Sequence, residues 1–222
     1  WLDRPWDVAR PLPSGEPDGG DLEAEAGAVD VALDEETTRA LLQEVPPVYG
    51  TQVNDALLAA LSRALCGWTG GRAVAVEVEG HGREELFGGV DVSRTVGWFT
   101  SAFPVLLETA DDAGVLLRET KETLRAVPRK GLGFGAVRWT SEDGTRAARL
   151  AAIPVPEVNF NYFGQGGGGP AADAWLRAGP ERVGAHQSPR NRRPRAVEVI
   201  ASGGGGGVHV RWIYPSRPSS SP

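Results

Sequence analysis

The segment AVAVEVEGHGRE, residues 73–84, places an apolar strand directly before a charged loop that contains two glycines. Because side chains alternate along a strand, the valines should face one side and the acids Glu77 and Glu79 the other. A strand that ends in such a loop can position catalytic or binding residues. The same pattern also fits a solvent-facing edge with two acids, since glutamate is seldom buried unless it is paired. The pattern alone leaves both interpretations open.

Composition limits the classes of protein to which the chain can belong. Its 222 residues are enough for one domain or one large lobe with a core, and 41% are hydrophobic. A net charge of −6 argues against a general affinity for nucleic acid or an anionic membrane. No apolar stretch approaches the roughly 20 residues that span a bilayer. We therefore expect a globular protein without nucleic-acid or membrane partners.

Cysteine and methionine usage adds two expectations. Cys66 is the only cysteine, so no intrachain disulfide forms, which fits a reducing, cytoplasmic location. A lone cysteine and three scattered histidines give no metal-ligand spacing, so we expect no metal site. The chain has no methionine, not even at position 1, which suggests a piece of a longer polypeptide.

Helices and strands alternate in the pattern of an α/β protein. Helices are predicted from the N-cap Asp34 to about Val45, ending before Pro46-Pro47, and over residues 51–65 and 112–127. Strands are predicted at residues 28–33, 73–79, 101–106, 157–163, 196–201 and 208–214, the last two forming a hairpin.

Several connecting segments have a distinct composition. The glycines of residues 128–135 suit a connector that passes close to another backbone, and residues 166–170 suit a flexible spacer. The arginines between residues 190 and 195 form either a solvated loop or a docking patch for an acidic partner. Residues 216–222 are expected to be a linker or a disordered tail.

Five segments, in chain order, resemble core motifs of the epimerization domains of nonribosomal peptide synthetases. Residues 79–84 match EGHGRE without a change, and residues 94–100 match RTVGWFT. Residues 53–58 resemble the helix with a D-x-L-L core more loosely. Residues 128–135 resemble PxxGxGYG with Phe for Tyr, and residues 160–165 resemble FNYLGQ with Phe for Leu.

The first two motifs of that family, including the histidine pair of HHxxxDG, have no counterpart in this sequence. Residues 1–215 therefore look like the C-terminal lobe of an epimerization domain. The resemblance implies a chloramphenicol-acetyltransferase-like lobe, in which a mixed β-sheet is packed with helices. It also implies one half of a two-lobed domain with a tunnel between the lobes, so we expect the isolated lobe to be inactive.

By resemblance, the substrate is an aminoacyl or peptidyl thioester on the 4′-phosphopantetheine arm of a peptidyl carrier protein, and no cofactor binds directly. Glu79 would exchange the Cα proton, with the family histidine of the N-terminal lobe opposite, while Glu77 is a surface acid. His81 and Arg83 would support the site, Arg83 by orienting Glu79 or a nearby loop. Asn161 and Tyr162 would line the tunnel.

Two other functions fit the same sequence. A condensation-type lobe, which forms peptide bonds, shares the fold but usually lacks the EGHGRE and FNYLGQ motifs. A non-catalytic lobe that only docks a carrier protein would need no complete active site. In each case the partners are the N-terminal lobe, a carrier protein and neighbouring synthetase modules.

Overall fold

The computed structural model describes residues 1–13, 22–85, 88–164, 184, 187–204 and 207–216. The chain forms two compact units. The first unit comprises Trp1–Pro13 and Val45–Asn159, and the second comprises Ser14–Glu44 and Phe160–Pro222. Strand β4, Val158–Tyr162, begins in the first unit and continues into the second.

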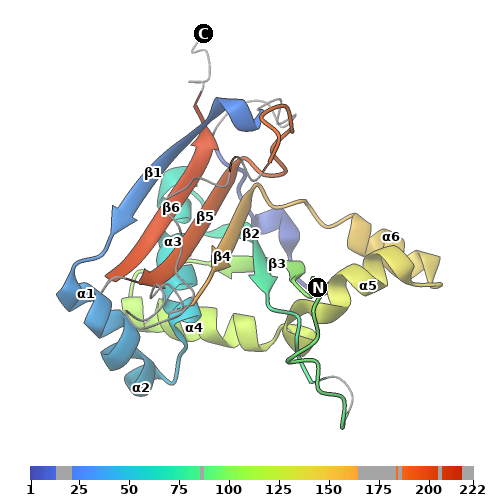
Figure 1. The fold of residues 1–222 in the computed structure, drawn as a ribbon, viewed down its shortest axis with the longest axis horizontal. Coiled ribbons are helices and arrows are strands. Elements are labelled where there is room, and N and C mark those ends of the chain that lie inside the picture. Colours follow the sequence, from blue (N-terminus) through green and yellow to red (C-terminus); the bar gives the residue numbers. More distant parts are fainter. Residues whose placement is uncertain (14–21, 86–87, 165–183, 185–186, 205–206, 217–222) are drawn as a thin grey trace. The chain divides into compact units, whose positions relative to one another are not determined.

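The first unit is built on the antiparallel pair β2, Ala73–Gly80, and β3, Ser101–Glu108 (Figure 1). The predicted alternation of β2 is confirmed: Val74, Val76 and Val78 are buried, whereas both glutamates are half-buried. Pro104 stands opposite Glu77 in a one-to-one register, and β3 is a terminal strand, as its proline predicted.

Two helices pack on this strand pair. Helix α3, Val53–Thr69, presents Leu58, Leu61 and Leu65 to the core, and it contacts β2, β3 and α4. Its first turn is closed by Asp55, whose Oδ2 accepts a hydrogen bond from the backbone N–H of Gln52 at 2.8 Å. Helix α4, Ala113–Arg125, begins at the N-cap Asp112 and contacts β3. The helices predicted over residues 51–65 and 112–127 are thus confirmed, with shifted ends.

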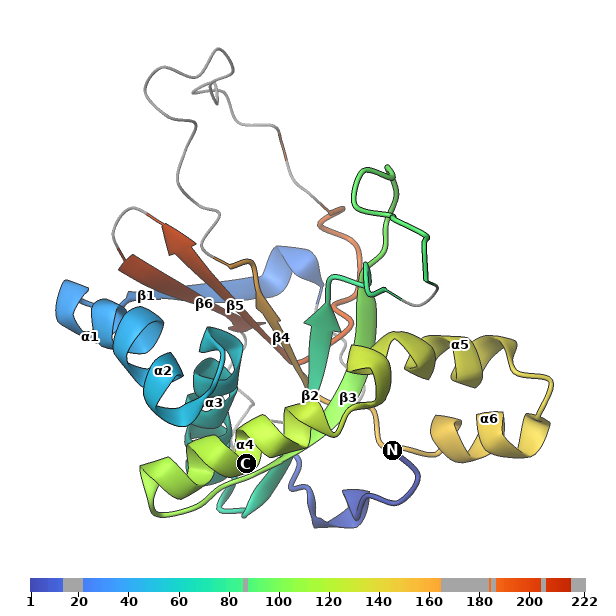
Figure 2. The same ribbon diagram turned by 90° about the horizontal axis from the view of Figure 1, so that it is seen from below.

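The glycine-containing segment after α4 is a connector only in its first half, where Arg129, Lys130 and Gly131 have positive φ. From Leu132 on it is α-helical, which corrects the prediction for its second half. A 3-10 turn at Pro128–Gly131 leads into α5, Leu132–Thr140, and α5 forms a helical hairpin with α6, Gly144–Ala151 (Figure 1 and Figure 2). Among these glycines, Gly131 makes a close approach, but to an aromatic side chain and not to the backbone that we expected. Its φ is +86°, and a Cβ there would lie 1.8 Å from the Phe103 ring.

The described part of the second unit contains the end of β4 and the complete strands β1, β6 and β5, paired in that order (Figure 1). Strand β1, Ala26–Ala32, pairs antiparallel with β6, Gly207–Pro215, which pairs antiparallel with β5, Val197–Gly204. The predicted hairpin of the last two strands is confirmed. The buried side chains of β5 and β6 are Val197, Val199, Ala201 and Val208.

The helix predicted to stop before Pro46-Pro47 does not stop there. Helix α1, Glu35–Arg39, is followed by a π-helical turn, Ala40–Glu44, and by α2, Val45–Tyr49, which contains both prolines. The prolines occupy the first turn of α2, where backbone N–H groups have no helical partner to lose. The predicted N-cap is correct, since Asp34 Oδ1 accepts a 2.7 Å hydrogen bond from Thr37 N–H.

The arginine cluster is not uniformly solvated. Arg193 is 6% exposed, and its Nη2 donates to Glu198 Oε1 at 3.3 Å and to the Ile213 carbonyl at 3.1 Å. This arginine therefore supports the packing of the second unit instead of facing solvent.

Some predictions fall outside the described residues. The spacer at residues 166–170, Gln165 of the last motif and residues 217–222 are among them. Ser216, the first residue of the expected linker, donates its backbone N–H to the Glu25 carbonyl at 2.9 Å. No helix in the described part of the chain has the length and apolarity needed to cross a bilayer.

Candidate functional site

Glu79 lies next to the last residue of β2, directly before the charged loop. Its neighbour across the ladder is Ala102, whose methyl group fills little space on that face. Burial raises the pKa of the Glu79 carboxyl above its usual value, while a hydrogen bond from Asn159 lowers it and the charge of Glu77 raises it again. A half-buried carboxyl with a raised pKa is suited to exchange protons near neutral pH.

Asn159 on β4 joins the two acids of β2. Its Nδ2 donates to Glu79 Oε1 at 3.3 Å and to Glu77 Oε1 at 3.4 Å. Glu77 is half-buried and takes part in this arrangement, whereas the sequence suggested a surface acid. Two carboxylates and one amide therefore share one face of the first unit.

The loop after β2 approaches the loop before β3 very closely at Gly82. This glycine is buried with φ of +66°, and a Cβ there would lie 1.5 Å from the Phe99 carbonyl oxygen. Only glycine fits this conformation and this contact without displacing backbone. The EGHGRE and RTVGWFT segments are thereby held against each other.

Arg83 strengthens the same contact. Its Nη1 donates to the Val92 carbonyl at 2.5 Å, its Nη2 to the Gly97 carbonyl at 3.4 Å, and its guanidinium lies 4.1 Å from the centre of the Phe99 ring. Arg83 thus fixes the loop of residues 88–100 relative to the end of β2.

His81 and Glu84 form a second set of contacts. His81 Nδ1 accepts a hydrogen bond from Arg83 N–H at 3.0 Å, and its Nε2 lies 2.9 Å from Glu84 Oε1. Nδ1 is therefore the unprotonated nitrogen and Nε2 the donor. Glu84 Oε2 also pairs with Lys130 Nζ at 3.0 Å, which ties the loop to the turn at residues 128–131. Both ring nitrogens of His81 are engaged within the loop.

Asn161 and Tyr162 belong to the part of β4 in the second unit. Strand alternation places them on opposite faces, with Asn161 on the face of Asn159. The Tyr162 hydroxyl is buried without a hydrogen-bond partner among the described residues, and burial raises its pKa. The structure thus brings Glu79, His81 and Arg83 together in the first unit and describes Asn161 and Tyr162 in the second.

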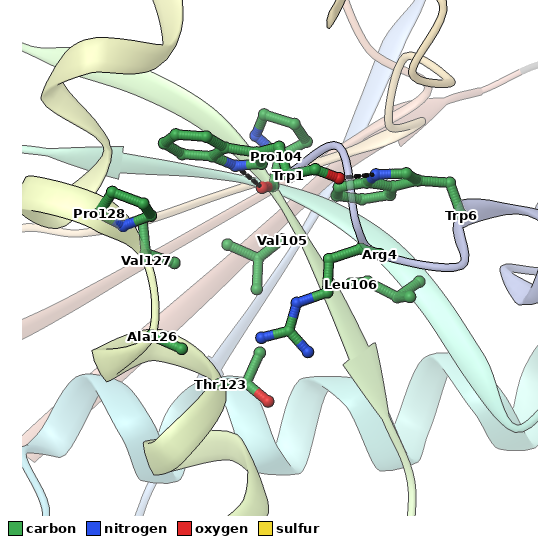
Figure 3. Close-up of a pocket in the computed structure, with 10 residues that line it drawn as sticks. All are labelled: Trp1, Arg4, Trp6, Pro104, Val105, Leu106, Thr123, Ala126, Val127 and Pro128. Carbon is green, nitrogen blue, oxygen red and sulfur yellow. Dashed lines mark hydrogen bonds between the residues drawn. The ribbon is translucent and has the colours of Figure 1, made fainter. Parts of the chain in front are cut away.

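A small cavity lies between the N-terminal segment, β3 and the end of α4 (Figure 3). Trp1 Nε1 donates to the Pro104 carbonyl at 3.0 Å, and Trp6 Nε1 donates to the Trp1 carbonyl at 2.9 Å. The volume of this cavity is about 30 Å³, far below the roughly 300–1,000 Å³ of ligand pockets. The cavity therefore belongs to the packing of the N-terminal segment.

Sequence reasoning missed Asn159, Glu84 and Lys130. Asn159 was detectable in part, because a polar residue at the same parity as Asn161 marks a polar face of β4. The pairing of Lys130 with Glu84 had no local signal, since 46 positions separate them. No group of three or more His, Cys, Asp or Glu residues in the described ranges is arranged to hold a metal ion.

Comparison with known proteins identifies the family. The condensation-domain family matches residues 2–216. The chain is 52% identical over 178 residues to one of the subunits of the linear gramicidin synthase of Brevibacillus parabrevis, a match that covers 79% of the chain and 3% of that protein. It is 36% identical over 212 residues to surfactin synthase subunit 1 of Bacillus subtilis (strain 168), covering 94% of the chain and 6% of that protein.

A solved structure agrees with the fold. The epimerization domain from the third module of tyrocidine synthetase B superposes with a TM-score of 0.78 at 32% identity, covering 93% of this chain and 45% of that one. The predicted fold class, a lobe in which a mixed β-sheet is packed with helices, is confirmed by this likeness. The chain spans less than half of that domain and only a few per cent of the synthetases it matches. It belongs to the condensation-domain family of nonribosomal peptide synthetases.

Proposed function

We propose that this chain supplies the C-terminal half of the active site of an epimerization domain. The complete domain would convert the L form of an aminoacyl or peptidyl thioester to the D form. The observation that carries this proposal is Glu79, a half-buried carboxyl with a raised pKa at the end of β2. Its loop is fixed through Gly82 and Arg83.

The chemistry requires a base and an acid on opposite faces of one carbon. The Cα–H bond breaks, its proton passes to the Glu79 carboxylate, and its electron pair enters the thioester as an enolate. A proton delivered to the other face by a group of the N-terminal lobe completes the inversion. A carboxyl whose pKa lies closer to neutrality than usual is a stronger base for taking that proton.

Two observations favour epimerization over condensation. The epimerization domain of tyrocidine synthetase B is 32% identical to this chain, whereas the first condensation domain of the CDA synthetase is 17% identical with a TM-score of 0.55 and shares the fold alone. The EGHGRE motif is also intact, and its charged side chains make contacts that hold the loop in place.

The proposal implies several partners. The substrate would arrive on the phosphopantetheine arm of a peptidyl carrier protein, and the N-terminal lobe of the same domain would close the site. Neighbouring modules of a synthetase would supply the thioester and consume the D product. The reaction would take place in the cytoplasm.

The test is exchange of the Cα proton. The complete domain, with both lobes, is incubated in D₂O with an aminoacyl thioester on its carrier protein. Mass spectrometry counts deuterium, and chiral chromatography separates the D and L products. We expect label and inversion with the unaltered domain and loss of both, by at least about 100-fold, with Glu79→Gln.

Glu85→Gln is the matched control, because Glu85 is an exposed acid in the same loop. It should retain label and inversion, and both variants should still bind the carrier. Unchanged exchange in Glu79→Gln would remove Glu79 from the mechanism. Peptide-bond formation without label would instead assign the chain to a condensation domain, and carrier binding without either reaction would indicate a docking lobe.

A further inference from the structure

We propose that Asn159 is a positioning residue for Glu79, acting together with Glu77 as a charge partner. The inference rests on the proposed function of Glu79 and concerns which residues hold that carboxyl in position and set its pKa. None of the five matched motifs includes Asn159 or Glu77. The proposal therefore extends the site to two residues that the motifs do not contain.

The geometry begins with β2. Glu77 and Glu79 lie two positions apart, so their side chains leave the same face of the strand about 6.7 Å from each other. Two carboxylates at this spacing repel each other in a half-buried setting, because low dielectric strengthens the interaction. An uncharged donor placed between them relieves that repulsion without adding a charge.

Asn159 is such a donor. Its side-chain amide carries two N–H groups, and Nδ2 lies 3.3 Å from Glu79 Oε1 and 3.4 Å from Glu77 Oε1. The reverse orientation of the amide would point its carbonyl oxygen at two carboxylate oxygens, which is repulsive. One amide therefore bridges both carboxylates, through contacts slightly longer than a typical N–H···O hydrogen bond.

The surrounding charges support this division of roles. On the ladder, β3 presents the uncharged Ala102 opposite Glu79. In the loop, the Arg83 guanidinium donates to the Val92 and Gly97 carbonyls, and His81 pairs with Glu84. On β2, Glu77 acts on Glu79 through its charge and raises the pKa of that carboxyl. Asn159 from β4 opposes this effect through its hydrogen bond.

The two residues should therefore have opposite effects on Glu79. Removing the Asn159 donor takes away a group that favours the ionised carboxylate, so the pKa of Glu79 rises. Removing the charge of Glu77 takes away a repulsion, so the pKa of Glu79 falls. Effects of opposite sign distinguish this proposal from a general loss of structure, which would move both variants in the same direction.

The experiment measures Glu79 directly in the complete domain. Glutamate is labelled with ¹³C at the carboxyl carbon, Glu79→Gln assigns the resonance, and pH titrations are recorded for Asn159→Leu and Glu77→Gln. We expect the midpoint of Glu79 to move up in Asn159→Leu and down in Glu77→Gln. Asn191→Leu, which alters an exposed asparagine, is the control and should leave the midpoint in place.

Activity gives the second measurement. On the acidic limb of the pH profile, kcat/KM for deuterium wash-in should fall about fivefold in Asn159→Leu, the factor that one hydrogen bond of typical net strength represents. At high pH, where Glu79 is ionised in every variant, the difference should narrow. In Glu77→Gln the acidic limb should move to lower pH.

Two results would overturn the inference. One is a Glu79 midpoint that Asn159→Leu leaves unchanged, and the other is a shift of the same sign in both variants. The titration needs no turnover, so it is independent of the reaction proposed for the domain. If Glu79→Gln remained active while the midpoints moved as expected, the proposed function would fail and the roles of Asn159 and Glu77 would stand.

Discussion

Gly82 provides the most direct test of how the loops are held. A Cβ at this position would meet the Phe99 carbonyl oxygen at 1.5 Å, and φ is +66°. Real Cβ contacts stay beyond 3.0 Å, so Gly82→Ala requires the two backbones to separate by about 1.5 Å. Because the nearest atoms belong to backbone, no side-chain rotation relieves the contact.

The magnitude follows from two separate costs. The left-handed conformation costs alanine about 1–2 kcal/mol, and forcing extra volume into a packed site adds about 1–3 kcal/mol. We therefore expect Gly82→Ala to lower the free energy of unfolding by about 2–5 kcal/mol. A displacement of about 1 Å near the reacting groups can lower the rate about 100-fold, so exchange should suffer more than stability.

Two glycines of the same loop separate these contributions. Gly89 has φ of +85° with nothing within 4 Å of the added Cβ, so Gly89→Ala carries the conformational cost alone. Gly88 has open space and needs no left-handed φ, so Gly88→Ala should be neutral. Urea unfolding and deuterium wash-in of the complete domain are measured for all three variants. If Gly82→Ala matched Gly89→Ala in both measurements, the close approach to Phe99 would have no energetic role.

Two further predictions concern a cap and a charge. Asp112→Ala removes the Oδ1 acceptor that lies 2.8 Å from Val115 N; it should cost about 0.5–2 kcal/mol in urea unfolding with exchange unchanged, and the adjacent exposed Asp111→Ala should cost less. Glu79→Gln should stabilise the fold at neutral pH. The folded pKa of Glu79 is raised above 4.5, so the wild type loses stability as pH rises from about 4.5 through that folded pKa, whereas the glutamine variant does not. Unfolding is measured for both proteins at about pH 4 and about pH 7, on either side of that change. The glutamine variant should be more stable than the wild type only at about pH 7. An equal gain in stability at both pH values would show that burial of the Glu79 charge is not the cause.

Local patterns predicted the elements well where one rule applied. The alternation of β2 follows directly from its sequence, and the cap Asp34 was correctly placed, because it acts on an N–H group three residues away. Prediction failed where two rules competed. Proline can end a helix, which was our prediction for Pro46 and Pro47, but proline is also tolerated in the first turn of a helix. Both prolines lie in the first turn of α2.

The prediction for the segment after α4 failed for a different reason. Its glycines suggested irregular backbone, but Leu132 begins α5 and Phe134 is 5% exposed in that helix. Burial of this aromatic side chain outweighs the low helix propensity of its glycine neighbours, which costs about 1 kcal/mol for each glycine. Propensity is thus overruled by packing that the sequence alone does not display.

The part of the site that lies within one continuous segment was predictable from the sequence. The acids of β2 and the loop that follows them are contiguous, so the pattern located them. The contact of Asn159 with Glu79 joins positions 80 residues apart, and the contact of Lys130 with Glu84 joins positions 46 apart. Such pairs depend on how strands and turns come together, and no periodicity within one segment encodes them.

The contacts of the loop explain why a base can stand next to so many charges. A cation close to Glu79 would lower the pKa of that carboxyl and weaken it as a base. Arg83 directs its guanidinium to the Val92 carbonyl and the Phe99 ring, and Glu84 holds His81 on one oxygen and Lys130 on the other. Burial and Glu77 therefore outweigh the hydrogen bond from Asn159, and the pKa of Glu79 stays raised. The positive charges of the motif keep the loop in place while leaving the basicity of Glu79 intact.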